Sequence, residues 1–197
     1  MFQSVVLLCA AMSGVMSQGW GKPEVGTCPD IPVMEDFDIS KLYGRWYDVA
    51  HNHWLFGEPS ICCVTADYTE IDGTDMTAVQ SDELRVLGSA TNLQVKGVAQ
   101  HTDNPGQFEF YVPDVENPPS DGTSNYNFIA TDYENYACLY ECMQVEPELM
   151  EVLAFALSRD SHGENLCKDA FEALGVTTEE MVYTVHDDDC TYYPDPS

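Results

Sequence analysis

The chain has 197 residues, enough for one domain with a sizeable core, and it carries 34 Asp and Glu against only 7 Lys and Arg. The formal net charge of −27 disfavours nucleic acid and anionic membrane surfaces as partners, because binding to phosphate needs cationic neutralisation. We therefore expect no nucleic-acid partner and no insertion into a membrane.

The first 17 residues contain no charged side chain and include an apolar run over residues 5–11. That run is too short for a membrane-spanning helix, and small residues at 15–17 offer a signal-peptidase site. These features predict a signal peptide over 1–17, a single mature domain over 18–197, and a secreted, extracellular product.

Eight short strand patterns with turn signals between them follow over residues 43–157. In the second, Val64, Ala66 and Tyr68 alternate with polar neighbours, and a period of two with one apolar face indicates a half-buried strand. Such patterning predicts an all-β fold, an eight-stranded antiparallel up-and-down barrel that encloses a small ligand. The predicted strands are 43–51, 61–69, 76–84, 92–100, 107–112, 126–131, 136–143 and 149–157.

One helix is predicted after the barrel. Ser161 and Glu164 have capping-box spacing, apolar residues then recur on one face, and Gly175 is a fitting stop. We expect a helix over about 163–174, packed outside the barrel, and a C-terminal strand and tail over 180–197.

Eight cysteines occur, and Cys9 leaves with the signal peptide. The other seven are scattered without the close pairs that zinc needs, so an oxidising compartment predicts three disulfides and one unpaired thiol. Cys138 and Cys142 share a strand parity and can both point outward. Residues 187–189 are acidic but lack a calcium-binding loop, and no metal site is predicted.

Three motifs resemble the lipocalin (calycin) family. They are Gly44-Arg45-Trp46-Tyr47, then Thr131-Asp132-Tyr133, and finally Arg159. Residues 130–137 with Cys28 and Cys190 are similar to the apolipoprotein D branch, and 137–142 with Cys167 to the crustacyanins, which bind carotenoids. The resemblance implies a structural role at the closed end of the barrel for Gly44, Trp46, Thr131, Asp132, Tyr133 and Arg159, with the Arg159 guanidinium across the Trp46 face.

The resemblance also implies the disulfides Cys28–Cys142, Cys63–Cys190 and Cys138–Cys167. The alternative, a bridge through Cys62 with Cys63 free, stays open.

Alternation places the unpaired Cys62 in the barrel interior. There it would be a small buried hydrophobe, although an interchain disulfide and a nucleophilic thiol, as in the similar prostaglandin D synthase branch, are alternatives. No cation visible in the sequence would lower its pKa, so we predict no catalytic residue and no enzyme activity.

The predicted ligand is a non-covalently bound hydrophobic molecule, most closely a carotenoid such as astaxanthin, with a histidine at the mouth bonding its keto oxygen. A general lipid, sterol or bilin carrier is the alternative, and association with copies of itself or with other lipocalins stays open. Residues expected to contact the ligand, by alternation or by their position in the mouth loop, are Tyr47, Val49, His51, His53, Trp54, Phe56, Cys62, Val64, Tyr68, Phe108, Phe110, Phe128 and Tyr140.

Overall fold

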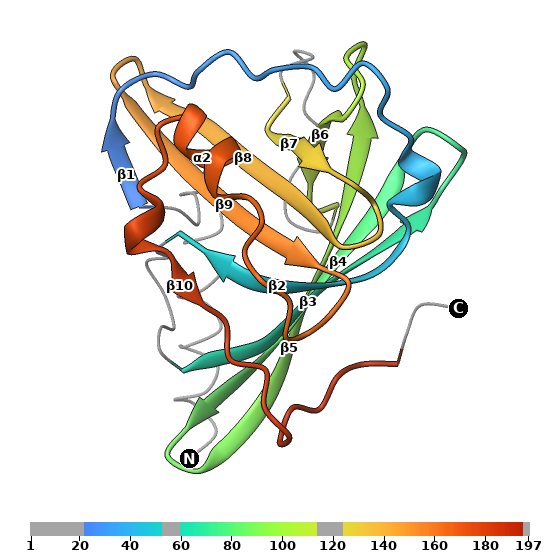
Figure 1. Cartoon of the computed structure of the whole chain (residues 1–197), viewed down its shortest axis with the longest axis vertical. Coiled ribbons are helices and arrows are strands. Elements are labelled where there is room, and N and C mark those ends of the chain that lie inside the picture. Colours follow the sequence, from blue (N-terminus) through green and yellow to red (C-terminus); the bar gives the residue numbers. More distant parts are fainter. Residues whose placement is uncertain (1–21, 53–59, 114–123, 195–197) are drawn as a thin grey trace.

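A computed structural model describes residues 22–52, 60–113 and 124–194 of the chain. Its strands form one ten-stranded antiparallel sheet, and β2 pairs with both β3 and β9, which closes eight strands into a barrel (Figure 1). This confirms the predicted barrel. The barrel strands are β2 (Gly44–His51), β3 (Ile61–Glu70), β4 (Met76–Val86), β5 (Ser89–His101), β6 (Gln107–Tyr111), β7 (Tyr126–Thr131), β8 (Tyr136–Glu146) and β9 (Leu149–Ser158).

Two short strands extend the sheet beyond the barrel. β1 (Lys22–Val25) pairs with β9, and β10 (Val182–Tyr183) pairs with β2. Because successive strands alternate in direction, the β4–β5 and β8–β9 hairpins lie at one end of the barrel, the open end. The 3₁₀ helix η1 (Ile39–Lys41) precedes β2 and lies at the opposite, closed end.

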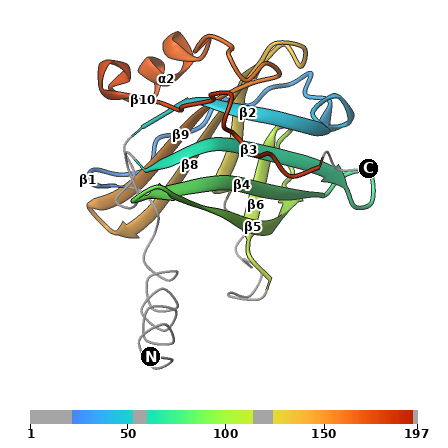
Figure 2. The same cartoon turned by 90° about the horizontal axis from the view of Figure 1, so that it is seen from below.

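The α-helix that follows the barrel is shorter than predicted. α2 runs only over Lys168–Ala173, and its N-cap is Cys167, so Ser161 does not cap it. At Gly163 the chain turns instead: its N–H donates to the carbonyl of Asp160, and a Cβ at Gly163 would lie 2.1 Å from the Ser158 hydroxyl. α2 packs outside the barrel, as expected, and the 3₁₀ helix η2 (Thr178–Glu180) follows it (Figure 2).

Two apolar clusters divide the fold into an inside and an outside. One fills the barrel and is called the interior cluster; its buried members are Leu42, Trp46, Tyr68, Met76, Ala78, Ala99, Phe108, Tyr126, Phe128, Ala137, Leu139, Leu153, Phe155 and Leu157. The other lies between the outer faces of β2, β8 and β9 and helix α2, and is called the helix-side cluster; its buried members are Val49, Ala50, Cys138, Tyr140, Cys142, Val152, Ala154, Ala156, Cys167, Phe171 and Met181.

The disulfides fasten the flanking segments to the barrel. The structure contains Cys28–Cys142, Cys63–Cys190 and Cys138–Cys167, the same pairs that the resemblance implied. They tie the N-terminal segment and the start of α2 to β8, and the C-terminal tail to β3. Two of them close loops of more than 100 residues, where cross-linking constrains the unfolded chain most.

Candidate ligand-binding barrel

The closed end is built around Trp46. This side chain is fully buried, its Nε1 donates to the carbonyl of Leu42 at 2.7 Å, and the Arg159 guanidinium carbon lies 3.7 Å from its ring centroid. The guanidinium also donates to backbone carbonyls of three segments, among them Arg45 at 2.8 Å and Lys41 at 3.0 Å. Because the Arg159 guanidinium stacks on the Trp46 ring and bonds these carbonyls, it holds η1, β2 and the β7–β8 turn together.

The turn over residues 131–135 completes this end. The Thr131 hydroxyl donates to the Tyr136 carbonyl at 2.6 Å, and the Asp132 carboxylate accepts three backbone N–H groups of the turn. Burial works against ionisation of Asp132, but these bonds and that from the Asn135 side chain hold its pKa below the usual value. The Tyr133 hydroxyl accepts from the Asp38 N–H at 2.8 Å, which ties the turn to the start of η1.

Above the closed end the interior is aromatic. Phe110 stacks on Tyr126 with ring centroids 5.1 Å apart, and the Tyr126 hydroxyl lies 2.7 Å from that of Tyr68. Phe128 makes edge contacts with both tyrosines. Gly97 makes this packing feasible, because a Cβ there would meet the Phe110 ring at 2.1 Å. The predicted residues Tyr68, Phe108, Phe110 and Phe128 all face inward, and alternation with Thr65 places Val64 on the same face.

Acidic side chains also face the interior, and the sequence reasoning missed them. Glu141 pairs with Leu153, and Asp82 with Leu93, at inward positions of the sheet. Burial raises the pKa of Glu141 to about 8 and that of Asp82 to about 6, against a bond from the Gln80 side chain to Asp82. The sequence feature that could have revealed Glu141 is strand parity. Glu141 occupies the opposite parity to Cys138 and Cys142, which were expected to face outward.

His51, predicted at the mouth, faces inward opposite Phe155. Its Nδ1 lies 2.6 Å from the Asp48 carboxylate, and the Thr184 hydroxyl lies 3.1 Å from the same carboxylate. The side chains of His51 and Asp48 are both almost fully buried. The Asp48 carboxylate and the Thr184 hydroxyl both contact Nδ1 of His51. A catalytic triad needs its acid and its nucleophile on opposite ring nitrogens, so these three residues do not form one.

Three predicted contact residues point away from the interior. Val49 and Tyr140 belong to the helix-side cluster, and the Tyr47 ring packs against His186 and Tyr192 of the C-terminal tail. Tyr47 and Val49 alternate with the inward-facing Trp46 and Asp48, so both face outward, and the register shift between Asp48 and Ala50 affects only the residues that follow. Their expected orientation was therefore wrong. Parity shared with Cys138 and Cys142 was the overlooked signal for Tyr140.

Cys62 is also on the outer face, contrary to the expected orientation. It pairs with Glu83, whose carboxylate bonds outward-facing Arg85, and its sulfur lies 3.4 Å from that of Cys63. The cause is a bulge between Cys62 and Thr65 in which Cys63 takes φ +58° and reverses the alternation. Burial raises the pKa of the Cys62 thiol and outweighs the opposing charge of Arg85, a cation that the sequence did not reveal.

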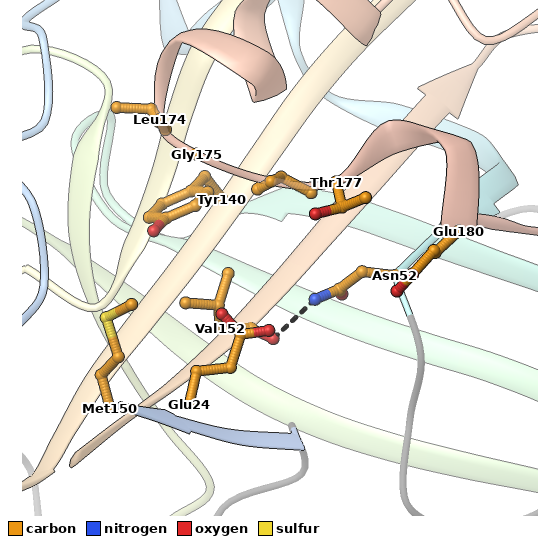
Figure 3. Close-up of a pocket in the computed structure, with 10 residues that line it drawn as sticks. Glu24, Asn52, Tyr140, Met150, Val152, Leu174, Gly175, Thr177 and Glu180 are labelled. Atoms are coloured by element: carbon orange, nitrogen blue, oxygen red, sulfur yellow. Dashed lines mark hydrogen bonds between the residues drawn. The ribbon is translucent and has the colours of Figure 1, made fainter. Parts of the chain in front are cut away.

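The predicted mouth residues His53, Trp54 and Phe56 lie outside the described residues. A separate pocket of about 70 Å³ opens on the outer wall between β9 and the segment after α2 (Figure 3). Tyr140, Val152 and Leu174 line it, with Glu24 and Glu180 beside them, and the Asn52 side chain donates to the Val152 carbonyl at 2.8 Å. Tyr140 thus faces a shallow outer hollow and not the barrel.

Comparisons with known proteins agree with this geometry. The Lipocalin / cytosolic fatty-acid binding protein family matches residues 43–188. Apolipoprotein D of Oryctolagus cuniculus is 32% identical over 146 residues, which are 74% of this chain and 73% of that protein. Lobster apocrustacyanin A1 has a similar structure, with a TM-score of 0.61 and 20% identity over 85% of this chain and 93% of the other. Insecticyanin from the tobacco hornworm Manduca sexta gives 0.56 and 18% over 85% and 90%.

A closed antiparallel barrel with an aromatic interior and a plugged end defines a class of proteins that bind small hydrophobic molecules. The chain belongs to the lipocalin family within that class. Among the described residues no helix is long and apolar enough to cross a membrane.

Proposed function

We propose that the protein is a secreted carrier that holds a carotenoid such as astaxanthin in its barrel, without catalysing a reaction. The observation that carries the proposal is the aromatic interior around the Phe110–Tyr126 stack, which suits a flat conjugated chain. The likeness to lobster apocrustacyanin A1 supports it at the level of fold. The signal-like first 17 residues and three disulfides support secretion.

A general lipid, sterol or bilin carrier is the second candidate. It is favoured by the higher sequence identity to apolipoprotein D and by the fold likeness to insecticyanin. The enzyme alternative has lost its main support, because Cys62 lies on the outer face and burial raises the pKa of its thiol.

The absorption spectrum separates the candidates. We expect protein purified from its natural source to show a carotenoid band, and recombinant protein to bind astaxanthin with saturable quenching of tryptophan fluorescence. A bilin band would favour the second candidate. Colourless protein that binds fatty acids but takes up no astaxanthin would contradict the carotenoid proposal.

Paired ring deletions test whether ligand binds inside the barrel. We expect Phe110→Ala to weaken carotenoid binding by about tenfold, since it removes a ring from the interior stack. Tyr47→Ala removes a ring of similar size from the outer face, where it packs against His186 and Tyr192, and should leave affinity unchanged. Equal losses in both variants, measured by the same quenching titration, would place the ligand elsewhere.

A further inference from the structure

Glu141 occupies a central position on the inner wall. It lies on β8 between the inward-facing Leu139 and the open end, and it is paired with Leu153 of the interior cluster. Paired residues of antiparallel strands project to the same side of the sheet, so the carboxyl enters the barrel. A carboxyl beside the apolar Leu153 costs stability unless it is hydrogen-bonded.

The Glu141 carboxyl has no hydrogen-bond partner among the described residues. It is enclosed, because loss of hydration by burial is what raises its pKa. The residue nevertheless keeps some accessible surface and is not counted among the buried core. Because the carboxyl projects inward from β8 and is not bonded to a described residue, it is available to a molecule held inside the barrel.

The groups around Glu141 do not supply a positive charge. Tyr68 of β3 and Tyr126 of β7 bond each other. Burial above all raises the pKa of both hydroxyls, and the Glu141 charge adds to it. β9 contributes Glu151 and β4 contributes Asp82, both acidic. His51 of β2 is held by Asp48.

The other described residues of the inner wall supply no free cation either. The Arg159 guanidinium is committed to Trp46 and to carbonyls at the closed end. No other inward position of the described strands is Lys or Arg, since Arg45, Arg85 and Lys96 pair with outward-facing residues or bond acidic groups outside. An anionic ligand head would thus meet acids without a counter-ion.

We propose that Glu141 is the polar anchor of the barrel interior, where its neutral carboxyl donates a hydrogen bond to a keto oxygen of the bound molecule. The barrel then selects neutral apolar ligands that carry a carbonyl over hydrocarbons and over carboxylates. This deepens the proposed function by assigning the residue that recognises the ligand's oxygen.

The Glu141 carboxyl can act as a hydrogen-bond donor only while it carries its proton. With a pKa raised to about 8 by burial, the carboxyl keeps its proton at neutral pH and is a donor to an acceptor-only ketone. A hydrocarbon leaves that donor unbonded. A carboxylate ligand brings a negative charge to an interior wall on which the described strands place acids and no Lys or Arg, which disfavours its ionised form.

Two ligand pairs with matched skeletons test the anchor. Canthaxanthin and β-carotene differ by ring ketones, and retinal and retinoic acid by an aldehyde against a carboxylate. We expect wild-type protein at pH 6 to prefer the carbonyl member of each pair by about three- to tenfold, and the preference for canthaxanthin to shrink by pH 9.5 as Glu141 ionises.

Two variants at position 141 and one control separate the anchor from a general effect. Glu141→Gln, whose amide donates without titrating, should keep the preference at both pH values, and Glu141→Leu should abolish it while the melting temperature shows a folded protein. Glu146→Gln, an exposed acid on the same strand, should behave as wild type.

A preference that survives in Glu141→Leu, or that falls with pH equally in Glu141→Gln, would overturn the anchor. If neither carotenoid binds, the proposed carotenoid function fails. The anchor is then judged on retinal against retinoic acid, and equal affinity of the three position-141 forms for that pair would overturn it too.

Discussion

Arg159→Ala is expected to lower the free energy of unfolding by about 3–5 kcal/mol. The cation–π contact with Trp46 contributes about 2 kcal/mol in a desolvated setting, and the variant also removes hydrogen bonds to backbone carbonyls, of which that to Arg45 is partly buried and that to Lys41 is exposed. Those carbonyls belong to η1, the start of β2 and the β7–β8 turn, so the variant loosens all three segments at once. Urea denaturation followed by tryptophan fluorescence measures the loss.

Two controls separate geometry from charge in that experiment. Arg159→Lys keeps the charge but not the fork of donors, so it should recover only part of the stability. Lys168→Ala removes an exposed cation whose ion pairs lie on the surface, and should cost well under about 1 kcal/mol. Ligand preference should be unchanged in all three. Loss of binding at an unchanged melting temperature would contradict the structural role of Arg159.

Much of the barrel could be predicted from the sequence because its strands are half-buried and bounded by clear turns. The expected strand over 126–131 matches β7 residue for residue, and the others differ by at most a few positions. β5 runs to the tip of its hairpin beyond the predicted 92–100, because pairing with β4 continues there through exposed residues that have no apolar alternation. Backbone pairing, unlike burial, leaves no periodic signal.

The side chains of the interior were harder to predict, and the reason is local. Alternation holds only while the register holds, and the bulges in β2 and β3 shift it by one residue, which turned His51 inward and Cys62 outward. Tyr47 and Val49 were misplaced for a simpler reason, because their parity is opposite to that of the inward-facing Trp46. Cys63 takes a positive φ without being glycine, so no glycine marked that bulge. Glu141 was missed for a different reason: an acid is assigned to solvent by default, and only the parity of its strand places it inside.

The inward carboxyl of Glu141 makes stability depend on pH in a direction that a surface acid would not give. Its pKa is raised from 4.5 to about 8 by burial, so the folded protein holds a proton that the unfolded chain releases above pH 4.5. Stability from this group is fully present below about pH 4.5, falls as the pH rises, and is lost above about pH 8. The loss is about 2–4 kcal/mol.

Glu141→Gln should remove that fall, because the amide does not titrate. We expect the variant to gain stability over wild type between pH 5 and pH 9 by the same amount, measured by urea denaturation at each pH. Asp82 shifts in the same direction, with a pKa of about 6, and its contribution remains in the variant. Glu146→Gln lacks an enclosed carboxyl and should keep the wild-type profile. Parallel profiles for wild type and Glu141→Gln would mean that the Glu141 carboxyl is hydrated, and the barrel would then hold water where a neutral ligand is proposed.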